Sequence, residues 1–390
     1  MLFPSRFETP WIRNVLIPEP CLLIRACTSY WCKLPEKMPV SQADTSSSPK
    51  EGLLLPSMEK KERIEALVWL GENLWTLPGL EDAIHRAGIR NAYFTEEFVR
   101  LALSGIQSWL RKDVLENWSN PVTEPAFSKK VGLVMAGNIP LVGFHDLMCV
   151  FVSGHVALYK PSNSDEVLTD FVIGVLLGQF PNASSYFQKT ERLNLAEALI
   201  ATGSRNTAVH FNHYFRHVPR IVRGARSSLG VVYGFERKEE LEPLCDDVMQ
   251  YFGMGCRSIT KILVPEGYDF HPFFEALEKY RYLTDHHKFQ NNAIYHKSIF
   301  LMNGDHFLDN DILMIRERPE LFSPQGVLHF EVYQNLEEAR EIARNHANEL
   351  QCIVSYQAQF PESLPFGTAQ NPGIDAYADG INTMQFLGKL

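Results

Sequence analysis

The sequence lacks three features that would place it in a specialised protein class. Its longest apolar stretch, residues 171–180, is about half of the roughly 20 residues that a membrane-spanning helix needs. Its seven cysteines include no C-x-x-C pair, which disfavours a disulfide framework or zinc knuckle and favours a reducing compartment. With 37 basic and 46 acidic residues, its net charge of −9 repels nucleic acid. We therefore expect a soluble, cytoplasmic protein with no membrane span and no nucleic-acid partner.

The 390 residues have an ordinary globular composition, with 45% hydrophobic and 21% charged residues. A chain of this length predicts about two to three domains. Residues 1–57 differ from the rest, because they show no hydrophobic period and include a polar run at 41–52. We interpret them as a disordered tail, or as residues upstream of the true start at Met58.

From Met58 onward the apolar residues follow regular patterns. Helical periodicity covers residues 61–75 and 95–118. Short apolar runs, each followed by a helical pattern, then occur at 131–137, 155–160 and 197–204. This alternation predicts parallel βαβ units, in which ligands gather at the carboxyl ends of the strands.

A second α/β unit is expected after Pro243. Helical patterns alternate there with four predicted strands, at 259–264, 298–302, 327–333 and 352–355. The fold class expected from both units is α/β.

Two motifs at predicted strand ends carry polar donors. AGNIP at 136–140 presents Asn138 in a turn, where the amide either caps unusual backbone angles or faces a developing oxyanion. YKPSN at 159–163 offers donors for ribose hydroxyls or a phosphate, namely Lys160, Ser162 and Asn163. No carboxylate occurs in this turn until Asp165, which makes NADPH admissible as a cofactor.

Two further motifs combine glycine with a reactive or capping side chain. In ATGS at 201–204, Gly203 and Ser204 open a helix whose free N–H groups suit a pyrophosphate. In FGMGCRS at 252–258, Cys256 follows two glycines and precedes Arg257, a setting that favours a thiolate nucleophile. The other cysteines of the globular part are interpreted as buried hydrophobes.

A metal site is the competing interpretation of one histidine cluster. His210, His213 and His217 follow i, i+3, i+7 spacing on a predicted helix. No Glu follows the first His and no Cys or carboxylate lies near in sequence, so we expect no metal.

The four motifs in this order resemble the aldehyde dehydrogenase superfamily. AGNIPLVGFHD and FGMGCRS resemble more narrowly the LuxC-type acyl-CoA reductases (fatty acid reductases), over roughly residues 60–390. The resemblance implies a Rossmann-like NADP-binding domain at 58–235 and an α/β catalytic domain at 236–365. Residues 366–390 would return to the interface between the domains.

Position by position, the resemblance implies a role for each motif residue. Asn138 would bind the oxyanion and Cys256 would be the nucleophile. Lys160, Ser162 and Asn163 would lie at the adenosine ribose, and Gly203 and Ser204 at the pyrophosphate. Glu320, in PELFSP at 319–324, would hold the nicotinamide ribose.

One departure from the family pattern carries information about the reaction. Aldehyde-oxidising relatives have a water-activating Glu in the segment that corresponds to residues 223–232, and none stands there; the next is Glu236. A thiol cofactor needs less activation than water, so the missing base favours a CoA-type reaction. The expected activity is NADPH-dependent reduction of a long-chain acyl-CoA or acyl-carrier-protein thioester to the aldehyde.

Two alternatives remain open at this point. One is a short-chain CoA-acylating aldehyde dehydrogenase, and the other is a non-catalytic nucleotide- or acyl-binding protein on the same fold. A homo-oligomer is admissible, although the sequence shows no projecting hairpin segment before Val131 of the kind that many superfamily members use to oligomerise.

Overall fold

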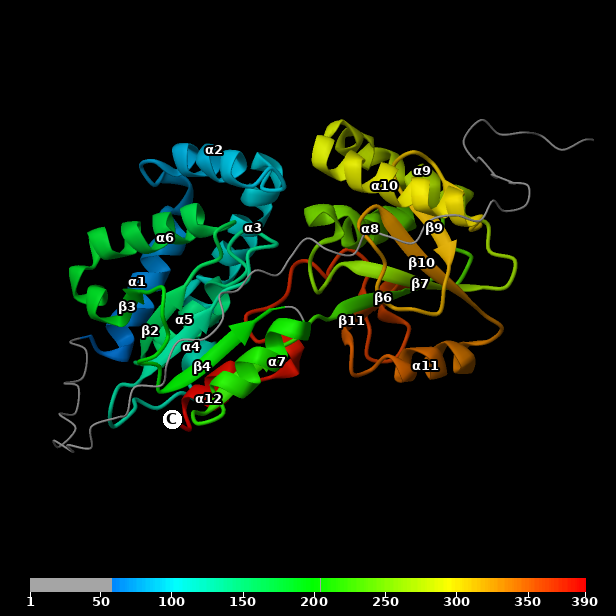
Figure 1. Ribbon diagram of the computed structural model, residues 1–390. Coiled ribbons are helices and arrows are strands. Elements are labelled where there is room, and N and C mark those ends of the chain that lie inside the picture. Colours follow the sequence, from blue (N-terminus) through cyan, green and yellow to red (C-terminus); the bar gives the residue numbers. More distant parts are fainter. Residues whose placement is uncertain (1–57, 204) are drawn as a thin grey trace, which may run out of the picture.

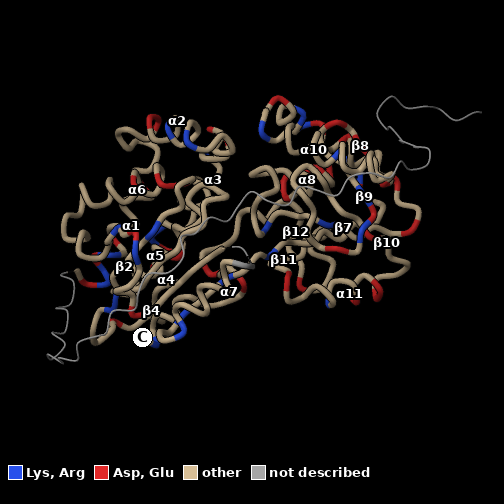
Figure 2. Tube along the Cα trace, in the orientation of Figure 1, with Lys and Arg blue, Asp and Glu red and all other residues tan. Residues whose placement is uncertain are grey.

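The computed structural model describes residues 58–203 and 205–390, and the expected N-terminal tail and Ser204 lie outside this range. Two α/β halves lie side by side, each built on its own sheet (Figure 1). The described helices include none that is long and apolar enough to cross a membrane. Acidic and basic residues intermingle on the outer helices of both halves (Figure 2).

The first half opens with four helices and continues as a five-stranded sheet. The helices are α1 (Lys60–Asn73), α2 (Leu80–Arg90), α3 (Glu96–Trp109) and α4 (Lys112–Ser119). The strands are β1 (Lys130–Val134), β2 (Val156–Lys160), β3 (Phe187–Lys189), β4 (Ala198–Thr202) and β5 (Arg220–Arg223). They are all parallel, in the order β3-β2-β1-β4-β5.

Helices connect these parallel strands, as the alternating pattern predicts. They are α5 (Phe144–Val152), α6 (Glu166–Gln179) and α7 (Arg205–Tyr214). The order of strands reverses direction at β1, so the loops that follow β1 and β4 diverge and leave a crevice at the carboxyl edge. This is the Rossmann-like arrangement expected for the first unit.

The second half is a seven-stranded sheet in the order β12-β11-β6-β7-β10-β9-β8. Its strands are β6 (Ser227–Val231), β7 (Ile259–Pro265), β8 (Leu308–Asp309), β9 (Met314–Glu317), β10 (Val327–Tyr333), β11 (Leu350–Ser355) and β12 (Leu364–Pro365). Its helices are α8 (Lys238–Met249), α9 (His271–Leu277), α10 (His287–Asn303) and α11 (Leu336–Asn345). Both halves together confirm the expected α/β class.

The chain passes from one sheet to the other earlier than expected. β5 ends at Arg223 in the first sheet, and β6 begins at Ser227 between β7 and β11 in the second. The expected first unit, residues 58–235, therefore includes one strand that pairs in the second sheet. Residues 366–390 run back to the first half, where α12 (Thr383–Leu387) packs against α5 (Figure 1).

One predicted strand is wrong. Residues 298–302 form the last part of α10, which begins at the His286 cap and ends where Gly304 adopts a φ of 69°. The side chain of His286 accepts a hydrogen bond from the backbone of Phe289. A five-residue apolar run fits a strand or one face of a helix equally well, and here the preceding cap and the glycine stop decide for the helix.

Candidate active site

A cavity of about 920 Å³ lies at the carboxyl edge of the first sheet, where the two halves meet. The loops after β1, β2, β4 and β5 all contribute to its lining. The remaining walls come from α3, the start of α5, the segment before β7 and the C-terminal residues 367–378. The cavity therefore gathers segments that span most of the described chain.

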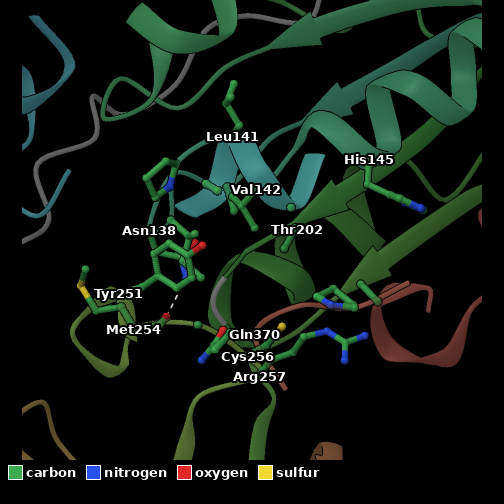
Figure 3. Close-up of a pocket in the computed structure, with 18 of the residues that line it drawn as sticks. Asn138, Leu141, Val142, His145, Thr202, Tyr251, Met254, Cys256, Arg257 and Gln370 are labelled. Atoms are coloured by element: carbon green, nitrogen blue, oxygen red, sulfur yellow. Dashed lines mark hydrogen bonds between the residues drawn. The ribbon is translucent and has the colours of Figure 1, made fainter. Parts of the chain in front are cut away.

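Four of the predicted site residues line this cavity, and they come from four separate motifs. They are Asn138, Ser162, Gly203 and Cys256. Figure 3 shows the hydrogen bond between Asn138 and Met254. Cys256 and Arg257 follow Met254 in the segment before β7 and lie nearby in the same view. The structure thus brings together side chains that are up to 118 residues apart in sequence, since Asn138 and Cys256 differ by that number.

A buried carboxyl group, that of Asp165, stabilises the turn that carries Asn138. Oδ2 of Asp165 accepts a hydrogen bond of 2.9 Å from the backbone N–H of Leu141, which has a φ of 55°. Asp165 is 2% exposed, and burial raises its pKa to about 8, although the Leu141 N–H acts in the opposite direction. The carboxyl group therefore faces the Asn138 turn and is absent from the described lining of the cavity.

Gly137 allows the Asn138 turn and the Ser162 turn to approach closely. A Cβ atom at Gly137 would lie 2.4 Å from both Cβ and Oγ of Ser162, which is closer than atoms can pack. Glycine is therefore required here by the close approach of the two loops.

Lys160 and Asn163, from the same motif as Ser162, do not line the cavity. The ammonium group of Lys160 lies 3.4 Å from a carboxylate oxygen of Glu191 and donates to the Glu191 carbonyl oxygen at 3.3 Å. The carbonyl oxygen of Asn163 accepts a hydrogen bond from Arg90 at 3.0 Å. Glu191 thus places a carboxylate beside the Lys160 turn, which could not be predicted from the turn's own sequence.

Glu320 is also outside the described lining, and its side chain is exposed. Side chains on the strands β7 and β10 donate hydrogen bonds to the backbone carbonyl oxygens of residues 319–321. Lys261 Nζ donates to Pro319 O at 2.6 Å, and Thr260 Oγ1 donates to Leu321 O at 2.7 Å. Nδ1 of His329 donates to the Glu320 carbonyl at 2.9 Å. The backbone here is well anchored, but the structure does not bring the Glu320 carboxylate to Cys256.

Cys256 is half-buried at the cavity wall, directly after Gly255. The backbone N–H of Gly255 donates to Ser258 Oγ at 3.0 Å, and that hydroxyl also accepts a bond of 3.0 Å from the Gln370 amide. Burial raises the pKa of the Cys256 thiol, and the adjacent Arg257 guanidinium only partly opposes this rise. The expectation that the surroundings lower this pKa is therefore wrong, since their net effect favours the thiol over the thiolate.

Asp146 is the one carboxylate among the described residues of the lining. Arg223 donates to its two oxygens at 2.5 and 3.0 Å, and the two side chains are only 4% and 14% exposed. Arg226 and Arg257 also line the cavity; Arg226 lies 3.3 Å from Asp379, and Arg257 donates to Ala376 O at 3.0 Å. The carboxylate of Asp146 is therefore occupied by a buried ion pair.

Ser228 lies in β6, within the segment 223–232 in which no water-activating carboxylate is present. Its hydroxyl donates to the Cys256 carbonyl oxygen at 3.1 Å and lies 3.1 Å from Cys352 Sγ. Glu236, the next carboxylate in sequence, accepts from the backbone N–H groups of Tyr233 and Gly234, both at 2.7 Å, and is absent from the lining. Glu236 thus has a structural role in a turn.

The histidine cluster does not form a metal site in the described part of the chain. His210, His213 and His217 are all exposed, on or just after α7. No group of three metal-ligating side chains is found among the described residues.

Several lining residues were not identified from the sequence. They are Tyr251, Gln370, His145 and Arg223. His145 lies among the rings of Trp109, Trp118 and Tyr377, and burial lowers its pKa. Three of them lie in or beside segments quoted above: His145 within AGNIPLVGFHD, Tyr251 five residues before Cys256, and Arg223 at the start of 223–232. Only Gln370 is brought to the cavity from a part of the chain without a recognised motif.

Comparisons with known proteins agree on the fold. No protein-family model matches the sequence, and no curated protein matches it either. Among solved structures, the chain is similar to aldehyde dehydrogenase 21 from Physcomitrella patens in complex with succinate, with a TM-score of 0.58 and 11% identity over 86% of this chain and 85% of that one. It is also similar to a propionaldehyde dehydrogenase from a Clostridium phytofermentans microcompartment (TM-score 0.54, 10% identity, 81% and 82% covered).

A third similar structure is betaine aldehyde dehydrogenase from Staphylococcus aureus in complex with NAD+, with a TM-score of 0.54 and 9% identity over 79% of this chain and 73% of that one. At these identities the comparisons show the fold alone. The chain has an aldehyde dehydrogenase-like fold.

Proposed function

We propose that this protein reduces an acyl thioester, acyl-CoA or an acyl-carrier-protein thioester, to the aldehyde, with Cys256 as nucleophile and NADPH as reductant. The observation that carries the proposal is the position of Cys256, half-buried at the wall of a cavity that the Asn138, Ser162 and Gly203 turns also line. A nucleophile beside the carboxyl edge of a doubly wound sheet lies where such sheets bind dinucleotides.

The lining fits a nicotinamide cofactor at the end formed by the first sheet. Gly137 and Gly203 line this end of the cavity, and the hydroxyls of Ser162 and Ser164, which also line it, are 3.2 Å apart. Ser162, Ser164 and Gly203 would hold the cofactor. When bound, the nicotinamide supplies a hydride to the acyl carbon.

The residues of the chain would carry the remaining chemistry. Cys256 Sγ attacks the thioester carbonyl carbon, and the bond to the leaving thiol breaks as that thiol takes the cysteine proton. One N–H of Asn138 donates to Met254 O at 2.7 Å, which leaves its other N–H to donate to the oxyanion. After reduction, the bond from carbon to Cys256 Sγ would break, which releases the aldehyde and leaves a thiolate, and this thiolate would take up one proton from solvent to restore the Cys256 thiol.

The lining also supports thioester exchange over hydrolysis. Asp146, its one carboxylate, is held by Arg223 through two hydrogen bonds and is not free to activate water. An acyl group on Cys256 would therefore persist until it is reduced or transferred to a thiol. We propose a long acyl chain because α3 lines the cavity with Leu101, Ala102 and Ile106.

Intact mass spectrometry tests the proposal directly. The wild-type protein mixed with palmitoyl-CoA and no reductant should gain the mass of one palmitoyl group, and this gain should disappear on addition of NADPH. Cys256→Ser should gain nothing, whereas the matched variant Cys352→Ser should behave as wild type. An adduct on Cys256→Ser, or unchanged aldehyde production by that variant, would refute the proposal. Acetyl-CoA in parallel distinguishes the long-chain from the short-chain reaction.

The choice between NADPH and NADH has its own test. The Glu191 carboxylate beside Lys160 would repel a 2′-phosphate, so Glu191→Gln should raise the ratio of kcat/KM for NADPH to that for NADH. If the ratio of the two kcat/KM values does not change, the adenosine ribose does not bind beside Lys160.

A further inference from the structure

The backbone immediately before Cys256 adopts an unusual conformation. Tyr251, Phe252 and Gly253 have φ angles of 54°, 56° and 69°, so three consecutive residues are left-handed. Only glycine adopts this conformation readily, and an aromatic residue there is a genuine outlier. Such backbone strain persists only where the surrounding structure holds it, and it concentrates at functional sites.

Aromatic packing holds Phe252 in this conformation. It is 2% exposed, and its ring lies 5.2 Å from that of Phe98 and 5.7 Å from that of Phe289. Rings of His286 and Tyr93 lie 4.5 and 5.1 Å away. With Phe252 fixed in the core, the reversed backbone places its neighbour Tyr251 against the cavity.

The Tyr251 hydroxyl has no hydrogen-bond partner among the described residues, although the residue is only 5% exposed. The hydroxyls of Tyr186 and Tyr333, equally buried, donate to the carbonyl oxygens of Met58 and Val232 at 2.9 and 2.8 Å. Burial raises the pKa of Tyr251, so its hydroxyl keeps its proton and can donate at any physiological pH. A hydroxyl at a cavity wall without a protein acceptor can donate to an acceptor on the ligand.

The position of Tyr251 limits which ligand acceptor it can reach. Its ring lies 5.4 Å from that of Phe98 on α3, the helix that supplies the apolar wall, and its carbonyl accepts from the Met254 N–H at 3.2 Å. Met254 O in turn holds the Asn138 amide, and Figure 3 shows Tyr251, Met254 and Asn138 on the same side of the cavity. Tyr251 thus lies between the apolar wall and the amide assigned to the oxyanion.

We propose that Tyr251 is a second substrate-binding donor, whose hydroxyl hydrogen-bonds to the carbonyl oxygen of the acyl thioester beside Asn138. This inference rests on the proposed function, because it requires a thioester that reacts at Cys256. It accounts together for the strained backbone and the unpartnered hydroxyl.

Tyr251→Phe tests the inference, because it removes one oxygen atom that has no protein partner. The rate of acylation of Cys256 by palmitoyl-CoA, followed by mass, should fall by about 100-fold, as for loss of one oxyanion donor. The rate of alkylation of Cys256 by iodoacetamide and the Tm should stay unchanged, since thiol and fold are untouched. Tyr295→Phe, a matched change at an exposed tyrosine on α10, should leave all three measurements unchanged.

The outcomes separate the two proposals. If Tyr251→Phe acylates at the wild-type rate while Cys256→Ser does not acylate, the proposed function stands and the role of Tyr251 is refuted. If alkylation and acylation fall together, Tyr251 acts only through the shape of the turn, and the inference is also overturned. If wild-type protein forms no acyl adduct, the proposed function fails, and the role of Tyr251 fails with it.

Discussion

The ion pair between Asp146 and Arg223 gives a quantitative test of how the floor of the cavity is held together. Arg223 on β5 donates to both oxygens of Asp146 on α5 and, at 2.8 Å, to Thr383 Oγ1 on α12. Replacing Asp146 by Leu would leave the guanidinium 4% exposed with one neutral acceptor, and its Nε already lacks a partner. Breaking one side of a buried pair costs about 3–5 kcal/mol, so we expect a loss of that size in the free energy of unfolding.

Urea denaturation of three variants provides the measurement. Asp146→Leu should lose about 3–5 kcal/mol, whereas the double variant with Arg223→Met should recover most of that loss, because no charge stays buried without its partner. Asp113→Leu is the matched control, since its pair with Arg111 is 62% and 66% exposed and contributes at most about 1 kcal/mol. A loss below about 1 kcal/mol for Asp146→Leu, or a double variant no more stable than the single one, would refute this account.

Three further predictions concern the turns around the nucleophile. In the folded protein the pKa of Asp165 is about 8, whereas its ordinary value is 3.8. Between these two pH values the carboxyl group is protonated in the folded state and ionised in the unfolded state. The contribution of Asp165 to the free energy of unfolding therefore falls by about 1.4 kcal/mol for each pH unit that the pH rises. Asp165→Asn should remove this contribution from the slope measured by urea denaturation between pH 5 and 8, and an unchanged slope would contradict the assignment. Gly137→Ala should cost about 1–3 kcal/mol of stability and slow acylation, because its new methyl group collides with Ser162; unchanged values of both would contradict the close approach. Arg257→Gln should raise the pKa of the Cys256 thiol further and slow its alkylation by iodoacetamide at pH 7, whereas faster alkylation would contradict the favourable charge interaction.

Much of the fold could be predicted from apolar runs and their spacing. The strands expected at 155–160 and 327–333 occur at Val156–Lys160 and Val327–Tyr333. The short strands β5 and β9 were not predicted, because four residues carry too little periodicity. The expected helix over 95–118 divides into α3 and α4 between Trp109 and Lys112, for which the pattern of apolar residues gives no signal.

The site could be predicted only in part, for a physical reason. Asn138, Ser162 and Gly203 follow strands of one parallel sheet, whose topology alone brings their carboxyl ends together. Glu320 lies in the other half, where its position relative to the cavity depends on how the halves pack. The left-handed conformation of Tyr251 follows from tertiary contacts, which override local preference and leave no mark in the sequence.

The return of the last residues to the first half has a consequence for biosynthesis. Gln370 and residues 371–373 line the cavity, and α12 packs against α5, so one wall is supplied by a segment that is synthesised after every strand of both sheets. Both sheets can assemble beforehand, but the pocket around Cys256 is incomplete until this segment has been synthesised. A prematurely terminated chain would therefore carry the thiol without the chamber around it.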